Sequence, residues 1–150
     1  AFIEEVQRKC LRRFDETQSP EAVIGVLQKA IQKLYAGDVD PTELIERNRV
    51  SQPLEGYTQY TQNVAALERA RQQELSIHPG QDIKYVVVDD EKSSRERVKL
   101  AHETIDSYDA SYYETELLRA VESILSPTGW DQTKIRQAIG ETQNIQLSQF

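Results

Sequence analysis

The residues whose types and spacing could support chemistry are few, and the run Asp89-Asp90-Glu91 is the most suggestive of them. Carboxylate oxygens are the ligands that Mg²⁺ prefers. The run follows an apolar, β-branched segment, however, and consecutive residues of an extended chain point in opposite directions. We therefore expect a solvated loop here and not a metal site.

No other constellation favours an autonomous enzyme. The sequence has neither a Gly-x-Ser-x-Gly motif nor a phosphate-binding glycine loop. His78 precedes Pro-Gly, which is typical of a surface turn, and His102 is expected to be exposed, although it could contact a phosphate. Cys10 falls on the apolar side of a predicted helix, so we expect it in the core. We therefore expect no catalytic residue and no metal site in this chain.

The composition indicates a globular domain, with 38% hydrophobic and 29% charged residues among 150. Lys and Arg number 18 against 25 Asp and Glu, a net charge of −7 that by itself argues against a nucleic-acid-binding protein. No apolar run approaches the roughly 20 residues of a membrane span, and no secretory signal is visible. We expect a cytoplasmic protein without membrane contact. The start at Ala1 and the lack of methionine lead us to expect a piece of a longer protein.

Helical periodicity dominates the sequence. Apolar residues recur at intervals of three and four residues near 3–14, 20–36, 61–74 and 109–125, and a shorter helix is expected near 131–138. This pattern predicts a mostly helical protein.

Two short stretches favour β-strands. Residues 83–88 are rich in β-branched side chains. In 97–100 two apolar residues alternate with Arg97 and Lys99, so the two basic side chains would share one face of a strand. Between 44 and 51 the periodicity does not decide between helix and strand. We therefore expect an α+β fold, mostly α-helical with a small β-sheet.

Several blocks of this sequence resemble the thumb of archaeal family B DNA polymerases. The stretch Tyr-Asp-Ala-Ser-Tyr-Tyr at 108–113 is similar to a signature that begins a thumb helix in that family. The His-Pro-Gly turn at 78–80 and the strand Ile-Lys-Tyr-Val-Val at 83–87 resemble a second block. Further blocks lie at 40–57, 63–65 and 142–150. The blocks follow the family's order and nearly its spacing, so the resemblance covers about 110 residues, from roughly position 38 to the end.

The resemblance implies a thumb fragment of a DNA-directed DNA polymerase. Residues 1–37 would be a helical segment joining palm to thumb, 38–139 the thumb domain, and 140–150 a C-terminal tail. The catalytic aspartates of the palm and the exonuclease carboxylates would lie before Ala1. The fragment alone is expected to be inactive and to need no cofactor, while the parent nucleotidyltransferase would use Mg²⁺.

The resemblance also implies that the chain grips double-stranded primer–template DNA independently of its sequence, through phosphates and sugars. The candidate DNA-binding residues have basic or hydrogen-bonding side chains, namely Arg47, Arg49, Ser51, Asn63, Lys84, Arg95, Arg97, Lys99, Tyr108 and Tyr112. The alternative is that these residues are ordinary solubilising or core side chains. Tyr113 and Trp130 are expected in the core.

The tail contains a candidate sliding-clamp peptide. Asn144, Leu147 and Phe150 have the spacing of such a peptide, which is usually Gln-x-x-aliphatic-x-x-aromatic-aromatic. One helical turn would bring the aliphatic and aromatic anchors to one side. Here Asn replaces Gln, and a frayed terminus is the alternative. For the whole chain, the alternative is a non-catalytic helical interaction module whose tail docks on a sliding clamp.

Overall fold

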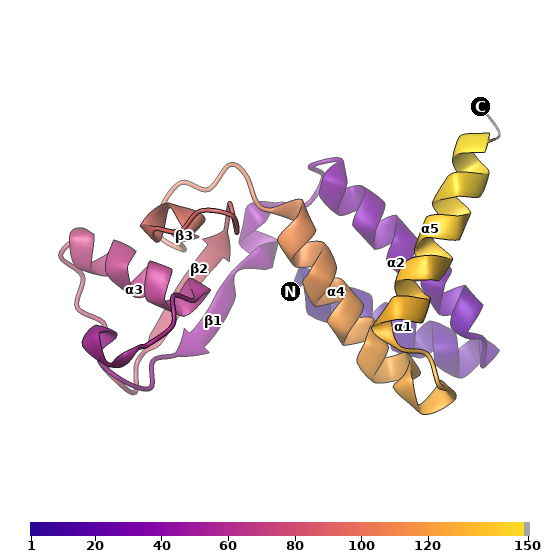
Figure 1. Ribbon diagram of the computed structural model, residues 1–150, viewed down its shortest axis with the longest axis horizontal. Coiled ribbons are helices and arrows are strands. Elements are labelled where there is room, and N and C mark those ends of the chain that lie inside the picture. Colours follow the sequence, from indigo (N-terminus) through magenta and orange to yellow (C-terminus); the bar gives the residue numbers. More distant parts are fainter. Residues whose placement is uncertain (149–150) are drawn as a thin grey trace. The chain divides into compact units, whose positions relative to one another are not determined.

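The structure is a computed structural model that describes the backbone of residues 1–148 and the side chains of residues 1–140. The chain forms two compact units (Figure 1). We call residues 1–39 and the chain from Tyr113 onward the helical unit, and residues 40–112 the sheet unit. The segments 1–37, 38–139 and 140–150 remain a prediction about polymerase parts, and the compact units have other boundaries.

The helical unit is built from helices whose ends carry local sequence signals. It contains α1 (Phe2–Thr17), α2 (Pro20–Tyr35), most of α4 (Ala110–Leu125) and α5 (Gln132–Ser148). The Ser19 hydroxyl accepts a hydrogen bond from the Ala22 backbone N–H at 3.3 Å, and Pro20 opens α2. Gly37 follows α2 with a φ of 74°, a conformation that glycine adopts without strain.

The apolar faces of these helices form one core. Leu27 and Leu117 are completely buried. Cys10, Tyr113 and Trp130 are buried as well, which confirms their predicted core positions. Burial disfavours the thiolate and raises the pKa of Cys10 to about 11, so this thiol is inert at neutral pH.

The sheet unit is a three-stranded antiparallel sheet with one helix. Its strands are β1 (Glu46–Arg49), β2 (Asp82–Val87) and β3 (Val98–Leu100), in the order β1-β2-β3. Helix α3 (Gln62–Gln72) packs on β2 and β3. Together with the helical unit, this confirms the predicted α+β fold, mostly helical with a small sheet.

The register assigns each strand residue to a face of the sheet. Tyr85 of β2 lies opposite Glu46 of β1 and Leu100 of β3. Directly paired residues have their side chains on the same face. The Tyr85 hydroxyl donates a hydrogen bond of 2.6 Å to Oδ1 of Asn63 on α3, so α3 covers this face.

The structure decides one point that the sequence leaves open and differs from the sequence-based expectations in two others. Residues 46–49 are a strand because they pair with β2, and this long-range pairing cannot be seen in the local periodicity. Arg97 ends a 3-10 turn, Arg95–Arg97, and β3 begins only after it; the Ser94 hydroxyl stabilises this turn by accepting from the Glu96 N–H at 3.3 Å. Helix α5 continues to Ser148, well beyond 138; this segment contains no proline to interrupt the helix.

Candidate nucleic-acid interface

The sheet face opposite α3 carries a group of cations that we call the basic sheet face. It consists of Arg47, Arg49, Lys84 and Lys99. Lys84 lies directly opposite Arg47, Arg49 lies opposite Asp82, and Lys99 lies opposite Val86. Because side chains alternate along each strand, all four cations point to one side. Four of the ten predicted DNA-binding residues are thus brought together by the strand register.

Two of these cations have partners within the sheet unit, and two have no ion pair with the side chains that the structure describes. Nε of Arg47 donates to Oδ2 of Asp82 at 2.6 Å, but the Arg47 side chain remains 68% exposed. Nζ of Lys99 donates to the Thr104 carbonyl at 3.2 Å. Arg49 and Lys84 are exposed, and no ion pair is described for them within residues 1–140.

The electrostatics of the basic sheet face favour a polyanion. Four cations face one carboxylate, that of Asp82, in a chain whose overall charge is −7. Val86 continues the same face but is fully buried, so the exposed part is centred on Arg47 and Lys84. Basic side chains can bind phosphate oxygens, and such contacts carry no information about the base sequence.

Asn63 lies on the other side of the sheet, in a polar network. Its Oδ1 accepts hydrogen bonds from Nδ2 of Asn48 at 3.1 Å and from the Tyr85 hydroxyl at 2.6 Å. Asn48 also donates to the Tyr85 hydroxyl at 3.1 Å. This network joins β1, β2 and α3, so the Asn63 side chain has a structural role here; its DNA contact remains a prediction.

The two arginines before β3 are not part of the basic sheet face. Arg97 donates to the carbonyls of Lys92 and Tyr60 at 2.7 and 3.4 Å, and its guanidinium lies 5.2 Å from the centre of the Tyr60 ring. These contacts hold Arg97 against the segment that leads into α3. Arg95 is exposed, and its carbonyl accepts a hydrogen bond from Arg69 at 3.3 Å.

The remaining predicted DNA-binding residues lie elsewhere in the sheet unit. The Tyr112 hydroxyl donates to a Glu46 carboxylate oxygen at 3.1 Å. Ser51 is exposed, and its N–H donates to the Tyr57 hydroxyl at 3.4 Å, whereas Tyr108 is half-buried. The structure does not bring these three residues to the basic sheet face, and their DNA contacts remain predictions.

The predicted sliding-clamp peptide lies outside the described side chains. The backbone of Asn144 and Leu147 belongs to α5, but their side chains and all of Phe150 fall beyond the part that the structure describes. The clamp peptide therefore remains a prediction.

An ion pair between α3 and the segment after β3 has no counterpart among the sequence-based predictions. Nε and Nη2 of Arg69 donate to the two carboxylate oxygens of Glu103 at 2.6 and 2.7 Å, and both side chains are 18% exposed. Glu103 also accepts from the Leu100 N–H at 2.7 Å. The hydrogen bonds from Arg69 lower the pKa of Glu103 to about 2. No local signal could reveal this pair, because its members are 34 residues apart.

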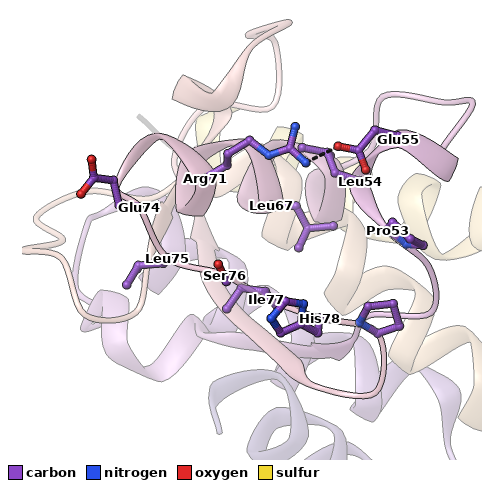
Figure 2. Close-up of a pocket in the computed structure, with 11 residues that line it drawn as sticks. Pro53, Leu54, Glu55, Leu67, Arg71, Glu74, Leu75, Ser76, Ile77 and His78 are labelled. Carbon is purple, nitrogen blue, oxygen red and sulfur yellow. Dashed lines mark hydrogen bonds and ion pairs between the residues drawn. The ribbon is translucent and has the colours of Figure 1, made fainter.

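A groove on the α3 side of the sheet unit is likewise not predictable from local patterns. It has a volume of about 500 Å³ and lies between α3, the 53–55 turn and the 74–79 segment (Figure 2). Arg71 forms an ion pair with Glu55 across its edge, and Leu75 is 43% exposed. His78 lines the groove, but no hydrogen bond between its ring and a carboxylate is described among residues 1–140. Among the residues that the structure describes, His78 is therefore not paired with a carboxylate that could support acid–base catalysis in this groove.

The acidic run that follows β2 makes contacts typical of a loop. Asp89 accepts from the Glu91 N–H at 3.0 Å, and Asp90 accepts from the Gln62 amide at 2.6 Å. Among the described residues, no three His, Cys, Asp or Glu side chains lie close enough to hold a metal ion. No helix in the described part is long and apolar enough to cross a membrane.

Comparisons with known proteins match most of the chain. It is 27% identical over 139 residues to a DNA polymerase of Pyrococcus glycovorans, covering 90% of this chain and 18% of that one. It is 26% identical over 140 residues to a DNA polymerase of Pyrococcus horikoshii, covering 90% of this chain and 11% of that one. The chain thus spans less than a fifth of the length of these relatives. No protein-family model matches it.

A solved structure has a similar fold. The family B DNA polymerase of the archaeon Pyrobaculum calidifontis matches with a TM-score of 0.70 and 21% identity, over 82% of this chain and 17% of that one. The sequence and fold comparisons point to the same kind of protein and confirm the resemblance to archaeal family B DNA polymerases; that the matched segment is the thumb remains a prediction. Over most of its length, this chain is similar to a segment of archaeal family B DNA polymerases.

Proposed function

We propose that this chain is the thumb of a family B DNA polymerase and that its basic sheet face binds the backbone of duplex primer–template DNA. The observation that carries the proposal is the cross-strand register, which places Arg47, Arg49, Lys84 and Lys99 on one face. The similarity to archaeal DNA polymerases favours DNA as the ligand of this face.

The mechanism is electrostatic positioning. Arg49 and Lys84 pair with phosphate oxygens, and Arg47 shifts from Asp82 towards a phosphate when DNA is present. These contacts displace counterions and do not read bases, which suits an enzyme that copies any template. Chemistry takes place in another part of the parent enzyme, and the thumb contributes by holding the duplex in place.

Magnesium enters this proposal only through the parent enzyme. In the part of the chain that the structure describes, no three His, Cys, Asp or Glu side chains are grouped closely enough to hold a metal ion. The Mg²⁺ requirement expected from the family resemblance remains a prediction about the parent protein.

Duplex binding by the 150-residue chain tests the proposal. A labelled primer–template duplex is titrated at several salt concentrations, and log K is plotted against log [salt]. The variant R47Q/R49Q/K84Q/K99Q is expected to weaken binding at low salt by at least about tenfold. It should also reduce the slope by about 0.9 for each phosphate that is no longer neutralised.

A matched control removes the same charge elsewhere. The variant R8Q/R12Q/R13Q/R136Q neutralises four exposed cations of the helical unit and is expected to retain most of the affinity and the slope. If both quadruple variants lose equal affinity, only the net charge matters and the basic sheet face is not the binding surface. No binding by the wild-type chain at low salt would reject DNA binding by this chain.

A further inference from the structure

A groove in the helical unit combines an apolar floor with a basic rim. It lies between α1 and α2 and has a volume of about 220 Å³. Its floor is formed by Phe2, Val6, Val26 and Ala30, and its rim by Glu5, Lys9, Lys29 and Lys33. We call it the lysine groove.

Most lysines of the helical unit gather at this groove. The helical unit has four lysines, and three of them line the lysine groove. Nζ of Lys9 lies 3.3 Å from the Glu5 carboxylate, whereas Lys29 and Lys33 are exposed and have no ion pair among the described residues. Two like charges one helical turn apart repel each other. An anionic partner would relieve that repulsion.

The dimensions of the groove favour a side-chain anchor. Small-molecule and cofactor sites enclose about 300–1,000 Å³, more than this groove offers. A volume of about 220 Å³ suits one or two leucine or phenylalanine side chains. Duplex DNA has no such group to cover the floor, whereas an amphipathic helix laid between two helices would bury apolar anchors there.

We propose that the lysine groove is a docking site for an acidic amphipathic helix of another polypeptide. Its leucine or phenylalanine side chains occupy the floor, and its carboxylates, one turn apart, pair with Lys29 and Lys33. This interaction is separate from DNA binding, since it uses the helical unit and none of the basic sheet face.

Two designed peptides test the proposal on the full 150-residue chain. The first is a fluorescein-labelled helical peptide with two leucines one turn apart, flanked by glutamates on an alanine background. The second has lysines in place of the glutamates. We expect the glutamate peptide to bind at least about tenfold more tightly in fluorescence anisotropy, since opposite charges then face the rim. Equal binding of the two peptides would overturn the proposal.

Variants of the rim and the floor locate the binding site. K29E/K33E is expected to weaken binding of the glutamate peptide at least about tenfold, while K29R/K33R keeps it. V26N, on the half-buried floor, is expected to weaken binding by removing the apolar contact without adding a charge. Circular dichroism confirms that each variant is folded.

A charge-reversal control outside the groove and a comparison with lipid vesicles complete the test. R12E/R13E changes two exposed charges of α1 outside the groove and is expected to change affinity less than about twofold. Equal losses in R12E/R13E and K29E/K33E would show unspecific charge attraction and overturn the proposal. The proposal would also be overturned if the chain bound phosphatidylglycerol vesicles through Lys29 and Lys33 more tightly than it binds the glutamate peptide. The groove would then bind a lipid surface.

Discussion

The two units bring their cations together in different ways. In the sheet unit, strand register places Arg47 beside Lys84, although the two are far apart in the sequence. In the helical unit, Lys29 and Lys33 share a side because they are one turn apart on α2. The basic sheet face has polar surroundings, which suit phosphates, and the lysine groove has an apolar floor, which suits a helix. The neighbours of a lysine, more than its charge, therefore decide which ligand it fits.

The largest effects are expected from the cores of the two units. L27A removes a fully buried side chain of α2 and should lower the free energy of unfolding by about 3 kcal/mol. V87A removes a smaller buried side chain of β2 and should cost about 2 kcal/mol. Denaturant unfolding measures both losses.

Trp130 distinguishes the two units in this experiment. It is the single tryptophan, is buried and belongs to the helical unit, so its fluorescence reports on that unit. L27A should shift the fluorescence transition. If V87A shifts it by as much as it shifts the circular dichroism transition, the two units unfold together and are not independent.

A second, smaller effect is expected from the ion pair between Arg69 and Glu103 in the sheet unit. E103Q leaves Arg69 with a weaker, neutral partner in a largely buried position and should cost about 1.5 kcal/mol of unfolding free energy at neutral pH. E55Q is the matched control, since Glu55 pairs with the exposed Arg71, and it should change stability little.

The pH dependence of E103Q follows from the lowered pKa of Glu103. The folded-state pKa is about 2 and the ordinary value is 4.5, so the carboxylate stabilises the fold above pH 4.5. That contribution is lost as the pH falls from 4.5 towards 2. The wild type should therefore lose about 1–2 kcal/mol more than E103Q between about pH 6 and pH 3. Parallel losses in the two proteins would contradict this assignment.

Helix caps should stabilise the two units equally. S19A removes the side-chain acceptor at the start of α2, and T61A removes the corresponding acceptor at the start of α3. Each is expected to cost about 1 kcal/mol. S19T and T61S, which keep a hydroxyl, are the controls. A cap effect confined to one unit would show that tertiary packing, and not the cap, fixes the other helix.

What the sequence predicts well in this molecule is local. The start of α2 at Pro20, the core positions of Cys10 and Tyr113, and the strand β2 all depend on nearby residues, and the sequence predicts each of them. The sequence does not decide the conformation of β1, because the hydrogen bonds of this strand are made with β2.

The candidate site shows the same limit. Residue types and the family resemblance identify each cation of the basic sheet face separately, but the sequence does not show that the four share one face. Alternation assigns Arg97 to a strand face, whereas the 3-10 turn directs it towards Tyr60. The alternation of side chains predicts which face of a sheet a residue occupies only where the strand is continuous. Interactions between neighbouring strands, such as the ion pair of Arg47 with Asp82, depend on the strand register and exist only in the folded sheet.

The smallest expected effect is a gain of affinity at the basic sheet face. Asp82 forms an ion pair with Arg47 at 2.6 Å and competes with phosphate for its guanidinium. D82N should strengthen duplex binding about threefold, because it removes one negative charge near the phosphates and frees Arg47. E43Q, an exposed carboxylate of the same unit outside the strands, should change affinity little. Salt titration of the duplex complex measures both variants. If D82N weakens binding, Asp82 orients Arg47 for phosphate, and the ion pair is then part of the DNA-binding surface and not its competitor.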